Sequence, residues 1–211
     1  MPRHEAPKAL PKPLKRPSQA RAKFTVQALY DTFVRIWRRD GPAAATTKAV
    51  AAEAGFAVGT VYDYFPNREA LFSGYVRHSL ELLLGRIDAQ VIAPGGLAWE
   101  QRLSRLVRIT ACADPDAAYF DAAMLAREHE VAEPKHHRRF FDELTAKWTE
   151  AIRSWPDLDP QPSDLTIRTL CVAVWGSRRY VLLVAPPAEA LGDWVSALER
   201  VARQALRAPS D

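Results

Sequence analysis

The segment 58–64, VGTVYDY, carries side chains suited to contact a nucleic acid. If the segment is helical, Val61 and Phe65 lie at the four-residue spacing of an inner face, and Tyr62 and Tyr64 face outward. An outward tyrosine can donate its hydroxyl to a phosphate oxygen and pack its ring on a sugar or a thymine methyl group. A glycine in the same segment lets a partner's backbone approach closely. The expected outward positions are Gly59, Thr60, Tyr62, Asp63 and Tyr64.

The residues before this segment predict the helix that must position it. Thr46 can cap a short helix whose inner face consists of small side chains, which let a second helix cross closely. These inner-face residues are Val50, Ala51 and Ala54. Gly55 then ends the helix, because glycine takes the left-handed conformation at least cost. Two helices joined by a turn of three or four residues form a helix-turn-helix, whose second helix can enter the major groove of DNA.

A third helix is expected directly afterwards. Pro66 ends the second helix, Asn67 can cap the next one, and Arg68 in its first turn suits a phosphate group. The aromatic residues at 62–65 would, taken alone, also fit an ordinary core cluster. We favour DNA contact, because a cap, a turn glycine, small crossing residues and a basic helix start occur here in the right order.

Over Phe24 to Phe72, through TTKAVAAEAGFAVGTVYDYFPNREALF, the sequence resembles the tetracycline-repressor-like (TetR) family of bacterial transcription regulators. The resemblance implies DNA contacts at the start of the second helix and along the recognition helix, from Thr47, Lys48, Val58, Gly59, Thr60, Tyr62 and Tyr64. Arg68 stands where a phosphate-binding lysine is common in the family. Two residues depart from the family pattern. Ala57 replaces a capping hydroxyl residue, and Asp63 either accepts from a cytosine amino group or, as we favour, faces solvent.

Positive charge is concentrated in the same part of the chain. The 211 residues carry a formal net charge of +4. Residues 1–72 contain 12 Lys and Arg against 6 Asp and Glu, whereas residues 73–211 contain 17 against 19. A basic footprint around the motif indicates an anionic partner such as DNA.

Composition leads us to expect a cytoplasmic protein that does not enter a membrane. Hydrophobic residues make up 48% of the chain without forming a run long enough to span a bilayer, and the N-terminal residues lack the apolar stretch of a secretory leader. Cys112 and Cys171 are far apart in the sequence. In a reducing compartment we expect them to be buried small hydrophobes, with redox sensing as the alternative.

We expect an all-α fold, because the sequence contains neither alternating strands nor a glycine-rich phosphate loop. The chain is expected to have three regions. Residues 1–17 are basic and proline-rich, and form a flexible arm that either reaches DNA or stays solvated. Residues 18–66 form a DNA-binding head, whose first helix ends at Asp40-Gly41-Pro42. Residues 67–211 form a helical domain for ligand sensing and dimerisation. Its helices are expected at about 67–91, 98–112, 115–131, 135–155, 163–184 and 187–206.

The last two of these helices carry broad apolar stripes, much of which core packing explains. A recognition helix contacts only a few base pairs, so two heads held one helical turn apart raise both affinity and specificity. The TetR resemblance likewise implies dimers formed by the last two helices of each chain. We therefore expect a homodimer whose interface includes Leu191, Trp194, Val195, Leu198 and Val201.

Aromatic and polarizable side chains are frequent in the middle helices, where a helical bundle offers a site for a small molecule. Each of them, taken alone, is more often part of a core, so they are a pool of candidates rather than a defined site. The pool consists of Trp99, Phe120, Met124, Phe140, Phe141, Trp148, Trp175 and Tyr180. We expect an apolar or aromatic effector.

Catalytic and metal-binding residues are not recognisable in the sequence. His129, Glu133, His136 and His137 form the one ligand-like cluster, but Pro134 interrupts the helix that would align them. Neither an HExxH motif nor paired cysteines at zinc spacing occur. We expect no enzyme, no metal and no cofactor.

Together these patterns predict a ligand-responsive transcriptional regulator. In this hypothesis it is a repressor that binds a palindromic operator as a dimer and is released by a small molecule. The alternative is an interaction protein that keeps the helix-turn-helix fold but binds a protein partner instead of DNA.

Overall fold

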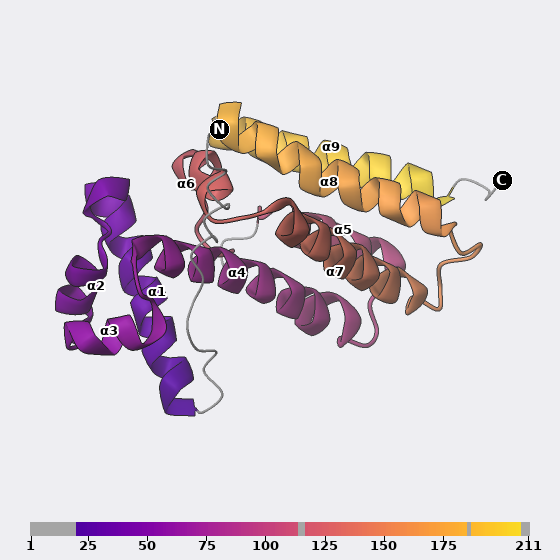
Figure 1. Ribbon diagram of the computed structural model, residues 1–211. Helices are drawn as coiled ribbons and strands as arrows, with labels where there is room; N and C mark the ends of the chain where they lie inside the picture. The colour runs from indigo at the N-terminus through magenta and orange to yellow at the C-terminus, as the bar shows by residue number, and fades with distance from the viewer. Residues whose placement is uncertain (1–19, 114–116, 185–186, 208–211) are drawn as a thin grey trace, which may run out of the picture. The chain divides into compact units, whose positions relative to one another are not determined.

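The computed structural model describes residues 20–113, 117–184 and 187–207, and all of the regular structure in these ranges is helical (Figure 1). The predicted all-α fold is therefore confirmed for this part of the chain. The predicted basic arm at 1–17 lies outside it. None of the helices described is both long and apolar enough to cross a membrane. The chain divides into two compact units, one with residues up to His78 and Ala126–Pro134, the other with Ser79–Leu125 and Lys135–Asp211.

The first unit contains the predicted three-helix head. Helix α1 spans Ala20–Asp40, α2 spans Thr47–Ala54 and α3 spans Val58–Tyr64. Helix α2 contacts both α1 and α3. Helix α3 has the bounds that the sequence predicted for the recognition helix.

Aromatic side chains form the core of the head and explain where its boundary lies. The ring of Trp37 in α1 stacks on that of Phe72, with centroids 5.5 Å apart, and Phe33 packs 5.8 Å from Tyr75. Phe72 and Tyr75 belong to α4, Arg68–Ile87. Because this core needs the first half of α4, the compact unit extends to His78, whereas we expected the head to end at residue 66.

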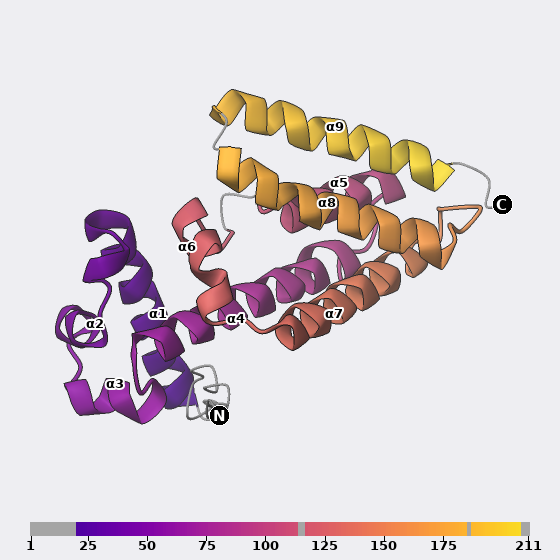
Figure 2. The ribbon, with the colours of Figure 1, turned by 45° about the horizontal axis from the view of Figure 1, so that its top comes forward.

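The second unit contains most of the remaining helices. Helix α4 continues into a π-helical turn, Asp88–Ile92, so the long helix predicted at 67–91 is present. The later helices are α5 (Trp99–Thr110), α7 (Pro134–Arg153), α8 (Asp164–Val184) and α9 (Ala188–Arg207). Helices α8 and α9 contact each other and run side by side (Figure 2). The fully buried Trp148 donates its indole N–H to Thr110 Oγ1 at 3.0 Å, which joins α7 to α5.

The prediction of one helix at 115–131 is wrong for the first half of that range. The structure has a short helix α6, Ala122–Arg127, followed by one 3-10 turn, and residues 117–121 are not helical. Asp121 is the cause, because its carboxylate accepts from the backbone N–H of Met124 at 2.7 Å and from the hydroxyl of Tyr119 at 2.8 Å. An aspartate that satisfies a free N–H in this way begins a helix rather than continuing one.

Candidate DNA-binding surface

The connection between α2 and α3 has the geometry of a helix-turn-helix. The hydroxyl of Thr46 accepts from the N–H of Ala49 at 3.1 Å, as the sequence predicted for a cap. Gly55 has φ 73° and ψ 24°, a left-handed conformation that ends α2. This turn directs the chain into α3 within three residues of the end of α2.

The inner and outer faces of α3 are those predicted from its sequence. Val61 is fully buried and Phe65, just after the helix, is nearly so. Tyr62 is 40% exposed and Val58 37% exposed. The other outward positions are the exposed Gly59 and Asp63 and the half-buried Thr60 and Tyr64.

The first residues of α3 include an N-cap without a capping side chain and a glycine that packing does not require. Ala57 occupies the N-cap position and makes no side-chain cap, so a hydrogen bond that a serine could provide is missing. A methyl group at Gly59 would lie in open space, since no heavy atom of another described segment comes within 4 Å of it. Packing within the chain therefore does not require glycine at this position, whereas close approach by a partner would.

The predicted phosphate contacts are placed at two helix starts. Asn67 caps α4 by accepting from the N–H of Ala70 at 2.7 Å, and Arg68 begins the helix half-buried. Lys48 is exposed in the first turn of α2. No carboxylate of the described residues pairs with Lys48 or Arg68. By contrast, Thr47 exposes only 7% of its surface and contributes to the core of the head.

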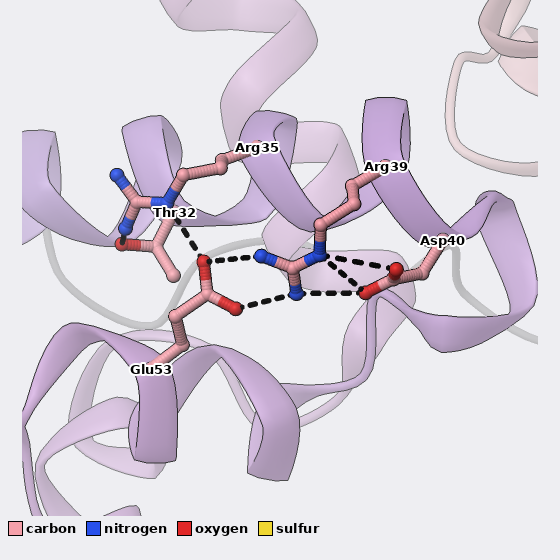
Figure 3. A network of polar contacts seen from close by, with 5 residues as sticks. All are labelled: Thr32, Arg35, Arg39, Asp40 and Glu53. Atoms are coloured by element: carbon pink, nitrogen blue, oxygen red, sulfur yellow. Dashed lines mark hydrogen bonds and ion pairs between the residues drawn. The ribbon is translucent and has the colours of Figure 1, made fainter.

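An ion-pair network that the sequence analysis missed joins α2 to α1 (Figure 3). Glu53 of α2 accepts from Arg35 Nε at 2.7 Å and from Arg39 Nη2 at 2.8 Å. Asp40 also pairs with Arg39, at 2.7 Å. The hydrogen bonds from Arg39 and Arg35 lower the pKa of Glu53 from 4.5 to about 2. The spacing of four residues between the two arginines was the one available signal, because it places both on one helix face.

Four members of the candidate ligand pool belong to or pack against one hydrophobic core, namely Trp99, Phe140, Trp148 and Trp175. Phe120, Phe140 and Trp175 lie together, since the rings of Phe140 and Trp175 are 5.0 Å apart and Arg178 lies over both Trp175 and Phe120. Met124 is fully buried as well, and Phe141 is half-buried. Tyr180 does not belong to any enclosed group, because it is 74% exposed.

The apolar stripe of α9 is partly covered by its own protomer. Val195 lies in the core of the second unit, whereas Val201 is 57% exposed and Leu191, Trp194 and Leu198 are half-buried. Helix α8 adds exposed large apolar side chains, namely Leu165, Val172, Tyr180, Leu183 and Val184.

The histidines and cysteines show no arrangement for chemistry. Within the described ranges, no three His, Cys, Asp or Glu side chains converge as metal ligands would. Burial raises the pKa of both thiols, that of Cys171 to about 12. A raised pKa disfavours the thiolate form that a redox sensor uses.

Comparison with known proteins places this surface in a family. Residues 29–74 match the model for bacterial regulatory proteins of the tetR family. No curated protein matches the chain significantly. The fold of the whole chain is similar to that of several solved regulators. A TetR-family transcriptional regulator from Streptomyces coelicolor has a TM-score of 0.59 and 16% identity, over 87% of this chain and 96% of that one.

Two further structures have the same fold. The fatty acid degradation regulator FadR from Bacillus halodurans has a TM-score of 0.55 and 16% identity, over 92% of this chain and 100% of its own. The multidrug binding protein EbrR, solved in complex with imidazole, has a TM-score of 0.53 and 18% identity, over 88% of this chain and 96% of its own. The sequence of residues 29–74 thus matches the tetR family of bacterial regulatory proteins, and the fold of the chain is similar to that of TetR-family transcription regulators.

Proposed function

We propose that the protein is a ligand-responsive repressor that binds a palindromic DNA operator as a homodimer in the cytoplasm. The observation that carries this proposal is the outer face of α3. Tyr62 and Val58 are exposed next to an unconstrained Gly59, while Val61 and Phe65 anchor the helix in the head. An exposed face with hydroxyls, rings and a bare backbone position fits the edge of a major groove.

The charges around α3 support contact with phosphate. Lys48 and Arg68 carry positive charges that no described carboxylate neutralises, whereas Arg35 and Arg39 are paired with Glu53. A charge without a partner in the protein is available to a phosphate oxygen at little cost. In this proposal Val58, Gly59, Thr60, Tyr62 and Tyr64 contact DNA, and Thr47 contributes by holding α2 in place.

The exposed apolar residues of α8 and α9 support a homodimer. Val172, Leu183 and Val201 are large apolar side chains on the surface of a single protomer. Pairing the same surface of two copies about a two-fold axis would cover them and hold two heads for two half-sites about 34–36 Å apart. Since Val195 is already in the protomer core, the proposed interface uses Leu191, Trp194, Leu198 and Val201 of α9.

The proposed switch uses α4, whose residues belong to both compact units. A rigid helix shared by two units can convert a small movement around a bound molecule into a change in the separation of the heads. Heads at the wrong separation cannot both enter successive major grooves. Linkage requires that operator DNA weaken effector binding by the factor by which the effector weakens DNA binding, which calorimetry with and without operator measures.

Sequencing the fragments that the protein retains from a random duplex library tests the proposal. We expect a two-fold repeat in the retained sequences. The alternative function, binding of a protein partner through the helix-turn-helix, is separated from it by salt. Neutralising several phosphates releases counterions, so affinity for the retained duplex should fall steeply with salt. A library with no enriched sequence would contradict the proposal.

A further inference from the structure

The second unit buries one guanidinium group among aromatic rings. Arg178 of α8 is 8% exposed. Its guanidinium carbon lies 4.9 Å from the centroid of the Trp175 ring and 5.1 Å from that of the Phe120 ring. The ring of Phe140 packs 5.0 Å from that of Trp175 and extends the aromatic cluster. Helices α7 and α8 and the non-helical segment around Phe120 thus meet around one cation.

Among the described residues, this cation has no anionic partner. A guanidinium keeps its charge at every accessible pH, so burying it is costly unless an anion or a full set of hydrogen bonds compensates. No carboxylate within 20–113, 117–184 or 187–207 forms an ion pair with Arg178, and its Nε is buried without a hydrogen-bond acceptor. The two rings offset part of the cost by cation–π attraction, but they accept none of the N–H donors.

A second positive group lies in the same region. Burial raises the pKa of the Cys112 thiol, and the charges of Arg178 and Arg86, together with a hydrogen bond from Arg178 to the sulfur, oppose this rise. Cys112 itself has φ 53°, a left-handed conformation that is uncommon for a residue with a side chain. This conformation ends α5, since the N–H of Cys112 donates to the carbonyl of Ile109 and the N–H of Ala113 donates to the carbonyl of Arg108, both at 3.0 Å.

We infer that Arg178 anchors an anion-binding site that takes the carboxylate of a small aromatic acid, with the ring of the acid lying against Phe120, Phe140 and Trp175. The edge of a guanidinium presents parallel N–H donors that match the two oxygens of a carboxylate. A monoanion suits this cluster better than a dianion, because the surrounding rings make burial of a second negative charge costly. This inference rests on the proposed function, since it specifies the chemical class of the effector.

Replacing Arg178 should have an unusual effect on stability. An arginine that served only to stabilise the fold would destabilise it when replaced. Arg178→Met removes a charge that has no anionic partner among the described residues and keeps an unbranched apolar stem, so the melting temperature of the ligand-free protein should stay equal or rise. A lower melting temperature would overturn the premise that the guanidinium lacks a partner.

Calorimetry on the full chain tests the site directly. The probes are benzoate, phenylacetate and 2-naphthoate, each paired with its neutral primary amide. We expect at least one acid to bind wild-type protein at least tenfold more tightly than its amide. Arg178→Met should abolish that preference and leave the amide affinity unchanged, and Arg178→Lys should retain only part of it. Arg138→Met, which removes an exposed charge from α7, is the matched control and should keep the full preference.

Three results would overturn the inference. They are no binding by any of the three acids at millimolar concentration, an unchanged preference in Arg178→Met, or tighter binding of inorganic phosphate than of every acid. A mobility shift on the selected operator separates this outcome from failure of the proposed switch. An acid that binds through Arg178 but leaves the operator bound at saturation would support the site and contradict the switch. If only neutral molecules released the protein from its operator, this result would support the switch and contradict the anion site.

Discussion

Glu53 of α2 and Arg39 of α1 are joined by two hydrogen bonds, from Nη2 to Oε2 at 2.8 Å and from Nη1 to Oε1 at 3.3 Å. This paired geometry fixes both the distance and the orientation of the two helices more strictly than a single contact would. Helix α2 in turn packs on α3. The pair therefore contributes to the position of the DNA-binding surface although neither residue lies on α3.

Replacing Glu53 by glutamine should destabilise the head and weaken DNA binding. Glutamine keeps the shape of glutamate but leaves Arg35 and Arg39 without a shared counter-charge, so α2 would be held less firmly. Thermal unfolding and a mobility shift measure the two effects. Glu143→Gln, which breaks an exposed ion pair with Arg139 within α7, is the control and should change neither.

The same pair predicts a dependence on pH. The pKa of Glu53 is lowered in the folded protein, so its contribution to stability is fully present above the unfolded value of 4.5 and is lost as the pH falls towards about 2. The difference in melting temperature between wild type and Glu53→Gln should therefore shrink over this range. A difference that stays constant from pH 7 to pH 2 would contradict the role given to the ion pair.

Gly59→Ala should stabilise the protein and weaken its binding to DNA. The methyl group meets no other described segment, and alanine favours a helix over glycine by about 0.5–1 kcal/mol. On DNA the same methyl group would obstruct close approach of the backbone, and we expect at least a tenfold loss of affinity. Gly85→Ala in α4 is the matched control, because it is also helical and unobstructed and should give the stability gain alone. Unchanged DNA affinity in Gly59→Ala would show that α3 does not approach DNA at this point.

Lys48→Ala and Arg68→Ala should weaken binding to all DNA sequences alike. Both side chains are expected to contact phosphate, which carries no sequence information. Each substitution should reduce the slope of log affinity against log salt by about one. Arg138→Ala in α7 removes an exposed charge outside the head and should leave the slope as it is. If both variants had the salt slope of the wild type, neither Lys48 nor Arg68 would contact phosphate.

Val201→Glu should convert the proposed dimer into monomers. The side chain is 57% exposed in one protomer, so the charge is tolerated there, but a two-fold interface would bury it twice without a partner. Light scattering measures the mass. Val58→Glu, at an apolar position of the head that is 37% exposed, should leave the mass unchanged. A wild-type protein that is monomeric at micromolar concentration would contradict the dimer itself.

The ends of helices could be predicted from the sequence where neighbouring residues determine them. Thr46, Gly55 and Pro66 set the ends of α2 and α3, because capping, left-handed turns and helix termination depend on neighbouring residues. The start of α6 was missed although Asp121 is a good cap, since the apolar pattern around it continued across the boundary.

Contacts between helices could not be predicted in the same way. The pairing of Glu53 with Arg35 and Arg39 depends on how α2 crosses α1, and 14 or more residues separate the partners. The aromatic surroundings of Arg178 depend on packing between segments more distant still. Sequence periodicity identifies which face of a helix is apolar but not which residue of another helix meets it.

The most direct test of DNA binding through α3 is the affinity of Tyr62→Ala for the operator selected by the wild-type protein. Tyr62 is exposed on α3, so its removal should leave the fold and the melting temperature intact. We predict that binding to the operator weakens by about 1–3 kcal/mol, the range expected for a good base or backbone contact. Equal affinities of the variant and the wild type in the same mobility-shift titration would contradict the account.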